Sequence, residues 1–326
     1  MRVPTLALTL GDPSGIGREI TVPAARAACA DGARILVLGP AELAPDDVPR
    51  VESVDELGDG PGVAWRATRS PDPGYALGEV SATAGAAALD ALRVGHELAL
   101  SRSVDALVTG PVNKAALWAA GERVEGQTEL LGRWADAPDV QMIGLAGPLR
   151  VLLATRHMPL KDAIASLTEE LVLDRVVLFH EALQSIGIAR PRIAVAGLNP
   201  HAGEGGLLGA EDGAILEPAV AAARRRGIDA TGPVSPDTVF AHGAEGRSDG
   251  VLALYHDQAF IPLKLCAQGR GVTLLAGMPY SRFSPMHGTA FDIVGRASED
   301  GRPLADPGNL VEALKIASRL GAPEPE

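Results

Sequence analysis

Short apolar runs recur along the chain, and each is followed by a turn marked by glycine or proline and then by a helical pattern. Nearly continuous apolar strands that alternate with helices indicate a parallel sheet covered by helices on both faces. The expected strands are 5–10, 34–39, 104–109, 149–155, 192–198 and 250–255. The expected helices are 83–100, 113–121, 160–167, 170–187, 210–226 and 307–319. The pattern therefore predicts an α/β fold.

Residues 40–78 have the weakest pattern, because they are rich in proline, aspartate and glycine. We expect a short helix followed by a hairpin or a loop insertion there. The chain has 326 residues, which corresponds to roughly two domains of about 150 residues each. A domain boundary near 125–130 fits the pattern, although the composition changes little at that point.

The composition and charge of the chain argue against some classes of binding partner. The apolar fraction is 46% and the aromatic fraction is 3%, so the core must consist mainly of aliphatic side chains. The net charge of −12 and the lack of a basic stretch argue against binding to a nucleic-acid duplex. The first apolar run is too short for a signal peptide, and no run approaches the ~20 residues of a membrane span. We therefore expect a cytoplasmic protein that binds neither nucleic acid nor membrane.

The ends of the predicted strands are where ligands of open parallel sheets bind. The turn Gly11-Asp12-Pro13-Ser14-Gly15 follows the first strand, but its glycine spacing is not that of the dinucleotide fingerprint. We interpret it mainly as a structural turn into a helix, with a role in shaping the ligand cleft as the alternative. Lys114 opens a helix after the third strand and either reaches toward this cleft or is solvated. No P-loop, HExxH zinc motif or GxSxG nucleophile elbow is present.

Three histidines follow three different strands. His157, His201 and His256 come directly after the runs 149–155, 192–198 and 250–255. One histidine at a strand end is usually a structural hydrogen-bonding residue, but three at corresponding positions favour a shared ligand. Three imidazoles with open coordination positions are typical of a catalytic divalent metal site. The sequence therefore predicts one divalent ion per subunit, with zinc, cobalt and magnesium as candidates.

Two cations lie downstream of the last of these histidines. Lys264 lies eight residues after His256, and Arg282 follows a turn at Gly277-Met278-Pro279. Since the chain as a whole is acidic, cations near a metal cleft suggest an anionic substrate. The alternative for each is an ordinary surface residue. His287 precedes Gly288 and Thr289, and it is a further candidate for the cleft.

Blocks of sequence along the chain resemble 4-hydroxythreonine-4-phosphate dehydrogenases of vitamin B6 biosynthesis. The resemblance covers residue 5 to about residue 316, and its most specific blocks are NPHAGEGG and YHDQ. The others, in chain order, are GDPSGIG, TGPVNKAAL, GQTELL, RHMPLKD, GPVSPDT and HGTAFDIVGR.

The resemblance implies a two-domain α/β/α sandwich like that of isocitrate and isopropylmalate dehydrogenases, with the active site in the interdomain cleft. It places 1–128 plus 287–326 in a first domain and 129–286 in a second domain that carries the histidines. It also implies a homodimer with active sites at the subunit interface. The implied reaction is NAD- or NADP-linked oxidation of a small phosphorylated hydroxy acid at C3, followed by decarboxylation of the β-keto acid.

The same resemblance assigns roles to residues. The metal ligands fall on His157, His201 and His256, and substrate contacts fall on Thr128, Lys264 and Arg282. We expect Asp237, Asp257 and Lys264 to be candidates for proton transfer or for orienting the ligands. Since no Rossmann fingerprint is present, the nicotinamide cofactor must bind through another set of loops. We expect these loops in the region 268–296.

The chain departs from the family pattern at three positions. Gln127 stands where a histidine is usual, and Thr273 stands where an asparagine is usual. Met286 replaces a carboxylate near the expected cofactor side. The first two changes concern substrate binding, so we expect a relaxed or shifted preference among small hydroxy acids.

Two alternatives to a dehydrogenase acting on 4-phosphohydroxy-L-threonine remain, one with another substrate and one without catalysis. A dehydrogenase of this family could act on 4-phospho-D-threonate, on the corresponding erythronate or on an unphosphorylated dihydrodiol carboxylate. An alternative of another class is a metal-containing binding protein without turnover.

Overall fold

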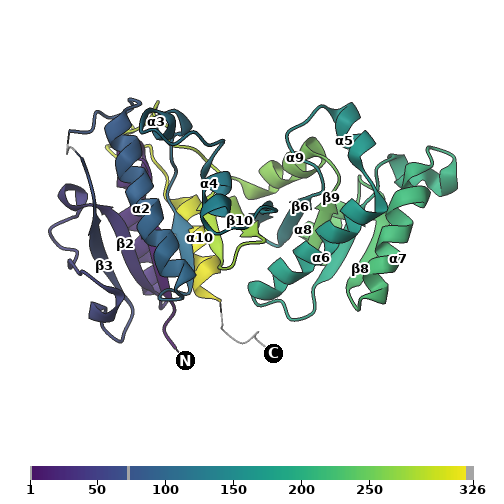
Figure 1. Cartoon of the computed structure of the whole chain (residues 1–326), viewed down its shortest axis with the longest axis horizontal. Coiled ribbons are helices and arrows are strands. Elements are labelled where there is room, and N and C mark those ends of the chain that lie inside the picture. Colours follow the sequence, from purple (N-terminus) through teal and green to yellow (C-terminus); the bar gives the residue numbers. More distant parts are fainter. Residues whose placement is uncertain (1, 72–73, 321–326) are drawn as a thin grey trace. The chain divides into compact units, whose positions relative to one another are not determined.

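The computed structural model of the chain describes residues 2–71 and 74–320. The chain forms two compact units. Of these residues, 2–71, 74–140 and 278–320 form unit 1, and Gln141–Gly277 form unit 2. Figure 1 shows the consequence for unit 1, where the yellow helix α10 lies among purple and blue elements from the beginning of the chain.

Unit 1 has a parallel sheet in the strand order β3-β2-β1-β4-β11. All five residues of β1 are buried, as expected for a parallel strand with helices on both faces. The strands are β1 (Thr5–Thr9), β2 (Arg34–Pro40), β3 (Gly62–Thr68), β4 (Ala106–Thr109) and β11 (Arg282–Pro285). The helices are α1 (Gly17–Ala30), η1 (Ala41–Leu43), η2 (Val54–Glu56), α2 (Ala82–Leu100), α3 (Lys114–Ala119), α4 (Gln127–Trp134) and α10 (Gly308–Ser318).

Unit 2 has a mixed sheet in the order β10-β5-β6-β9-β7-β8. Strands β6, β9, β7 and β8 are parallel, whereas β5 pairs antiparallel with both β6 and β10. The strands are β5 (Gln141–Ala146), β6 (Leu149–Leu153), β7 (Arg192–Ala196), β8 (Asp229–Val234), β9 (Gly250–Ala253) and β10 (Val272–Ala276). The helices are α5 (Leu160–Ser166), α6 (Glu169–Ser185), η3 (Pro200–Gly206), η4 (Asp212–Leu216), α7 (Glu217–Arg225), α8 (Val239–Ala244) and α9 (His256–Ala267).

The mixed α/β class predicted from the sequence is confirmed, but two expectations need correction. The sheet of unit 2 is not wholly parallel, because Gly147 adopts φ 58° and lets β5 turn back directly into β6 as a hairpin. Residues 40–78 contain no hairpin among those that the structure describes. They contain two short 3₁₀ turns and the parallel strand β3, whose Trp65 is fully buried.

The observed boundaries of the units differ from those expected from the resemblance. Helix α4 belongs to unit 1, because its Leu130 packs in a buried cluster with Leu92 of α2 and Leu117 of α3. Strand β11 also belongs to unit 1, since Arg282 and Phe283 pair with Leu107 and Val108 of β4.

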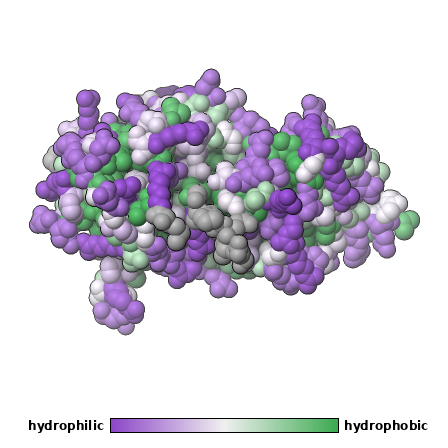
Figure 2. Space-filling view, turned by 90° about the horizontal axis from the view of Figure 1, so that it is seen from below, coloured by the Kyte–Doolittle hydropathy of each residue, from purple (hydrophilic) through white to green (hydrophobic). Residues whose placement is uncertain are grey.

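The surface drawn in Figure 2 is largely hydrophilic, and hydrophobic residues appear on it in small separate groups. Within residues 2–71 and 74–320, no helix is both long and apolar enough to cross a membrane. The cellular location expected from the sequence stays a prediction.

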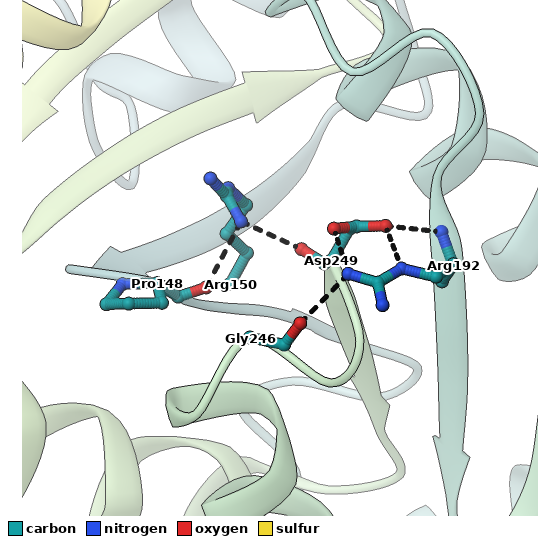
Figure 3. A network of polar contacts seen from close by, with 5 residues as sticks. All are labelled: Pro148, Arg150, Arg192, Gly246 and Asp249. Atoms are coloured by element: carbon teal, nitrogen blue, oxygen red, sulfur yellow. Dashed lines mark hydrogen bonds and ion pairs between the residues drawn. The ribbon is translucent and has the colours of Figure 1, made fainter. Parts of the chain in front are cut away.

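An ion-pair network joins strands β7 and β9 of unit 2 at their amino ends (Figure 3). The Arg192 guanidinium donates to both carboxylate oxygens of Asp249, at 2.9 Å each, and the Arg192 backbone N–H donates to Asp249 Oδ2 at 2.8 Å. Arg150 donates to the backbone oxygen of Asp249 at 3.2 Å. Burial raises the pKa of Asp249, but the hydrogen bonds and charge of Arg192 outweigh it, so this pKa lies below its usual value.

We expect Asp249→Asn to lower the free energy of unfolding by about 1–2 kcal/mol, because a charge-assisted bidentate pair is lost at a partly exposed site. A carboxyl whose pKa is depressed in the folded state stabilises the protein above its unfolded pKa. That contribution is lost as the pH falls through the folded pKa. Urea unfolding of both proteins at pH 7 and at about pH 3 measures this. If the two proteins differ in unfolding free energy by as much at pH 3 as at pH 7, the charge of Asp249 is not the source of the stabilisation.

Candidate active site

The three predicted histidines lie beyond the carboxyl ends of three neighbouring parallel strands of unit 2. His157 follows β6, His256 follows β9 and His201 follows β7. The rings of His157 and His256 are close, with centroids 5.5 Å apart and planes inclined by 44°. Adjacent pairing of β6 and β9 places these two side chains together.

His157 and His256 line a cavity of about 230 Å³. The His256 ring stacks on Phe260, with 4.5 Å between centroids, and its Nδ1 is 2.7 Å from Asp257 Oδ1. A carboxylate at Nδ1 favours the tautomer that carries the proton there, which leaves the Nε2 lone pair free for a ligand. The remaining residues around the cavity are Arg156, Met158, Leu160, Ala163, Tyr255 and Asp257.

His201 lies in a turn with unusual backbone geometry. Five successive residues from His201 to Gly205 have positive φ, including 52° at His201 and 44° at Glu204. The left-handed conformation costs roughly 1–2 kcal/mol for each residue that is not glycine. The glycines at 203 and 205 limit this cost, which explains the glycine-rich sequence of the turn. His201 is exposed, and Asp237 lies near enough for its pKa to be affected by this histidine.

The pKa of Asp237 is below its usual value, chiefly because Ser235 Oγ donates to Asp237 Oδ1 at 2.5 Å. The charge of His201 contributes to this lowered pKa of Asp237, whereas the His157 ring lies near that of His256. In the part of the chain that the structure describes, no group of three or more His, Cys, Asp or Glu side chains is arranged to hold a metal ion. The three-histidine metal site stays a prediction.

A buried carboxylate, which the sequence analysis did not single out, holds the turn that carries His201. Asp212 is 1% exposed and begins a π-helical segment. Its Oδ1 accepts from the Leu198 N–H at 2.8 Å, and its Oδ2 accepts from the backbone and side-chain nitrogens of Asn199 at 3.1 and 2.9 Å. The strained turn thus persists because a buried acceptor fixes its entrance. The only sequence signal was an acidic pair, Glu211-Asp212, after the glycine-rich block.

Lys264 and Thr273 are the other predicted substrate residues of unit 2. Lys264 lies in the last turn of α9 with an exposed side chain. Thr273 lies in β10 opposite Gly144 and is partly buried. Both therefore keep a polar group accessible, and their roles stay predictions.

Arg282 is the most deeply buried cation among the predicted site residues. Its residue is 3% exposed at the start of β11. One guanidinium nitrogen donates to Thr109 Oγ1 at 2.5 Å and to Gln127 Oε1 at 3.0 Å. Its buried Nε has no hydrogen-bond partner among the residues that the structure describes. Burial lowers the pKa of Arg282 to about 10, although Tyr280 and Glu129 act in the opposite direction.

These observations describe a buried guanidinium whose hydrogen-bond partners are neutral oxygens. A buried charge is costly unless an opposite charge and hydrogen bonds compensate it. Since Arg282 still has an unpaired N–H donor, an anionic ligand could supply both. Thr128 lies next to Gln127 at the start of α4 and is 9% exposed. The structure thus brings Gln127 and Arg282 into contact within unit 1, with Thr128 next along the chain.

The turn after β1, which the sequence predicts to be mainly a structural turn with a role in shaping the cleft as the alternative, contains a buried acid. Asp12 is fully buried. Its Oδ1 accepts from the Ser14 N–H at 2.9 Å, while its Oδ2 has no partner among the described residues. Burial raises the pKa of Asp12 to about 6, although backbone N–H groups of Ser14 and Asn113 lower it. The Asp12 N–H donates to Pro111 O at 2.9 Å, so this turn is joined to the one after β4.

The loop after β11 packs on that same turn. The Ile16 N–H donates to Thr289 O at 3.0 Å. A Cβ added at Gly15 would lie 2.8 Å from both Cβ and O of Thr289, so only glycine permits this approach. His287 Nδ1 is 2.9 Å from Gly288 O, and its buried Nε2 has no partner among the described residues. Of the predicted cofactor region, the loop 286–296 therefore packs against the turn after β1 in unit 1.

Comparisons with known proteins agree with this picture. The family model described as pyridoxal phosphate biosynthetic protein PdxA matches residues 29–317. A 4-hydroxythreonine-4-phosphate dehydrogenase of Beijerinckia indica is 42% identical, over 98% of this chain and 96% of its own length. A D-threonate 4-phosphate dehydrogenase of Salmonella typhimurium is 39% identical, over 98% of this chain and 100% of its own.

A solved structure is similar over nearly the whole length of the chain. The crystal structure of 4-hydroxythreonine-4-phosphate dehydrogenase from Klebsiella pneumoniae superposes with a TM-score of 0.85 at 36% identity, covering 97% of this chain and 99% of that one. The fold and the relatives define an oxidoreductase of the dehydrogenase class. The chain belongs to the PdxA family, which confirms the resemblance seen in its sequence blocks.

Proposed function

We propose that this protein oxidises a small phosphorylated hydroxy acid with NAD or NADP as the hydride acceptor. The substrate is 4-phosphohydroxy-L-threonine or a close analogue, oxidised at C3, and the resulting β-keto acid then loses CO₂. The proposal is supported by relatives named for 4-phosphohydroxythreonine and for D-threonate 4-phosphate. The observation that carries it is the buried, incompletely paired guanidinium of Arg282.

Arg282 suits a phosphate group for a physical reason. Thr109 and Gln127 hold one of its terminal nitrogens, Nη2, before any ligand arrives, so little side-chain freedom is lost on binding. A phosphate brings negative charge and several acceptors, and arginine can hold it through two parallel hydrogen bonds. Lys264 would add a second, more mobile positive charge. The location of the active site in a cleft between the units stays a prediction.

A divalent ion would be held by His157, His201 and His256. The pair His157 and His256 fits this role, since their rings share one cavity and Asp257 contacts His256 Nδ1. His201 would have to join them from the turn that Asp212 fixes. A bound metal would supply acidity to the substrate hydroxyl and stabilise negative charge on oxygen. Asp257 would orient His256, while Asp237 and Lys264 are candidates for moving the hydroxyl proton.

The nicotinamide cofactor would bind to unit 1 at the loop 286–296 and the turn after β1. Two features fit a cofactor there, namely the buried unpartnered Nε2 of His287 and the close backbone approach at Gly15. Met286 is partly buried beside them and brings no charge where the family usually has a carboxylate. Within residues 268–285 of the predicted region, the buried unpartnered atom is Arg282 Nε, which we assign to the substrate phosphate.

We also propose a two-fold homodimer, the commonest oligomer symmetry. Ile261 and Leu265 of α9 are one helical turn apart and expose 62% and 72% of their surface, which a second copy would cover. Light scattering at micromolar concentration is expected to give twice the mass of 33.6 kDa. Ile261→Glu, with Ile164→Glu of α5 as the matched control, is expected to shift the protein toward the monomer. A monomeric mass for the unmodified protein would contradict the dimer.

The experiment that tests the proposed function is a panel of acids incubated with NAD or NADP while reduced cofactor is monitored. The panel contains 4-phosphohydroxy-L-threonine, the 4-phosphates of D-threonate and D-erythronate, and an unphosphorylated dihydrodiol carboxylate. Turnover confined to phosphorylated acids supports the proposal. Turnover of the dihydrodiol alone would favour the second dehydrogenase candidate, and binding of a metal with no turnover of any acid would favour a binding protein.

A further inference from the structure

Gln127 makes two directional hydrogen bonds that fix its carboxamide. Its Nε2 donates to the Gly110 backbone oxygen at 3.1 Å, and its Oε1 accepts from the Arg282 guanidinium at 3.0 Å. An amide nitrogen can only donate and an amide oxygen can only accept. Because Gly110 O needs a donor, the nitrogen must face it, and the oxygen must then face Arg282.

The Gly110 backbone, whose carbonyl accepts from Gln127, is held rigidly by the sheet. Gly110 lies directly after β4, and its N–H donates to Thr9 O of β1 at 3.0 Å. A Cβ added at Gly110 would lie 2.4 Å from Leu10 O, so the backbone at Gly110 is packed tightly against the residue that follows β1. The orientation of Gln127 is therefore set by the sheet itself, and Gln127 transmits that orientation to the guanidinium.

Gln127 also leaves the charge of Arg282 uncompensated. A carboxylate at this position would pair with the guanidinium and satisfy it within the protein. A neutral amide orients the same nitrogen without cancelling its charge. The negative charge of Glu129 raises the pKa of Arg282, but no ion pair joins the two among the described contacts.

We propose that Gln127 is a positioning residue that orients the Arg282 guanidinium for an anionic group of the ligand and keeps its positive charge available. This rests on the proposed function, because it takes Arg282 to be the phosphate-binding residue. Gln127 then acts through Arg282 and not through a contact of its own with the phosphate. The chemistry selected is a dianionic group such as a phosphate monoester.

A double-mutant cycle tests this with inorganic phosphate as the probe and calorimetry as the readout. Gln127→Leu is expected to weaken phosphate binding roughly tenfold, the scale of one hydrogen bond to a charged group. In the Arg282→Lys background, Gln127→Leu is expected to weaken phosphate binding by less than about threefold, because an ammonium has no planar fork to orient. Gln127→Glu is expected to weaken binding more than Gln127→Leu does, since it neutralises the site. Gln184→Leu of α6 is the matched control, because that amide also donates to a backbone carbonyl, that of Ala189 at 3.2 Å.

The outcomes separate the inference from the function on which it rests. An equal loss in both backgrounds, or no loss from Gln127→Leu, would overturn the positioning role. Phosphate binding that is unchanged by Arg282→Lys would instead overturn the phosphate assignment of Arg282. Where calorimetry cannot follow the weakest variant, kcat/KM for the best phosphorylated acid completes the cycle. There the expected change from Gln127→Leu lies in KM, with kcat little altered, because the phosphate ester is bound but not changed in the oxidation.

Discussion

Replacing His256 by alanine is expected to abolish stoichiometric metal binding and to lower turnover by on the order of a thousandfold. Metal-ion stabilisation of a developing alkoxide contributes several kcal/mol to catalysis. His256 shares a cavity with His157 and has its Nδ1 held by Asp257, so its removal takes away an oriented ligand. Metal analysis after loading with Zn²⁺, Co²⁺ or Mg²⁺, together with an assay of reduced cofactor, measures both effects.

The control for this variant is His242→Ala, a change of a partly buried histidine at the end of α8 in the same unit. It is expected to bind metal and to turn over as the unmodified protein does. Because His256 also stacks on Phe260, thermal unfolding of His256→Ala must show that the fold is retained. Full metal occupancy in folded His256→Ala would refute the role of this histidine.

The second large effect is expected from Arg282→Lys, which should weaken transition-state binding of the phosphorylated acid by roughly 1–3 kcal/mol. Loss of one charge-assisted hydrogen bond costs a free energy of this size. Lysine keeps the charge of arginine but not its planar fork. The unphosphorylated form of the same acid should be affected much less. Comparing kcat/KM for the two acids isolates the contribution of the phosphate.

Arg133→Lys is the matched control, since Arg133 lies in α4 of the same unit but is exposed and pairs with Glu122. It is expected to leave both acids unaffected. If Arg282→Lys changes kcat/KM equally for the phosphorylated and unphosphorylated acids, Arg282 supports the structure of the site without binding phosphate. An unphosphorylated diol carboxylate would then become the favoured substrate.

The apolar runs predicted the strands that are buried on both faces, because such strands carry their signal in consecutive residues. Thus β1, β4, β6, β7 and β9 fall within predicted runs, and β2 extends one residue beyond its run. Strands β3, β5, β8, β10 and β11 lie outside the predicted runs. Strand β8 is mostly polar or partly exposed, with Ala230 its one buried residue, so hydrophobicity could not distinguish it from a loop.

The candidate site divides in the same way between what sequence can and cannot predict. The position of a histidine after a strand depends on local order, so the strand pattern could place His157, His201 and His256 after strands. That His157 and His256 are neighbours depends on the pairing of β6 with β9, which are not consecutive in the chain. The contacts of Gln127 with Gly110 and Arg282 join residues 17 and 155 positions apart in sequence, and no local pattern reports them. Asp12 and Asp212 were missed for a related reason, because an acid in a polar turn gives no sign of being buried.

The most direct test of the proposed reaction is the amount of CO₂ released per reduced cofactor formed from the best phosphorylated hydroxy acid. Oxidation at C3 produces a β-keto acid, whose decarboxylation releases one CO₂ for each hydride transferred. We predict equal amounts of the two products, with both absent when the nicotinamide cofactor is left out. Reduced cofactor without CO₂ would contradict the decarboxylation, and neither product from any phosphorylated acid would contradict the proposed function as a whole.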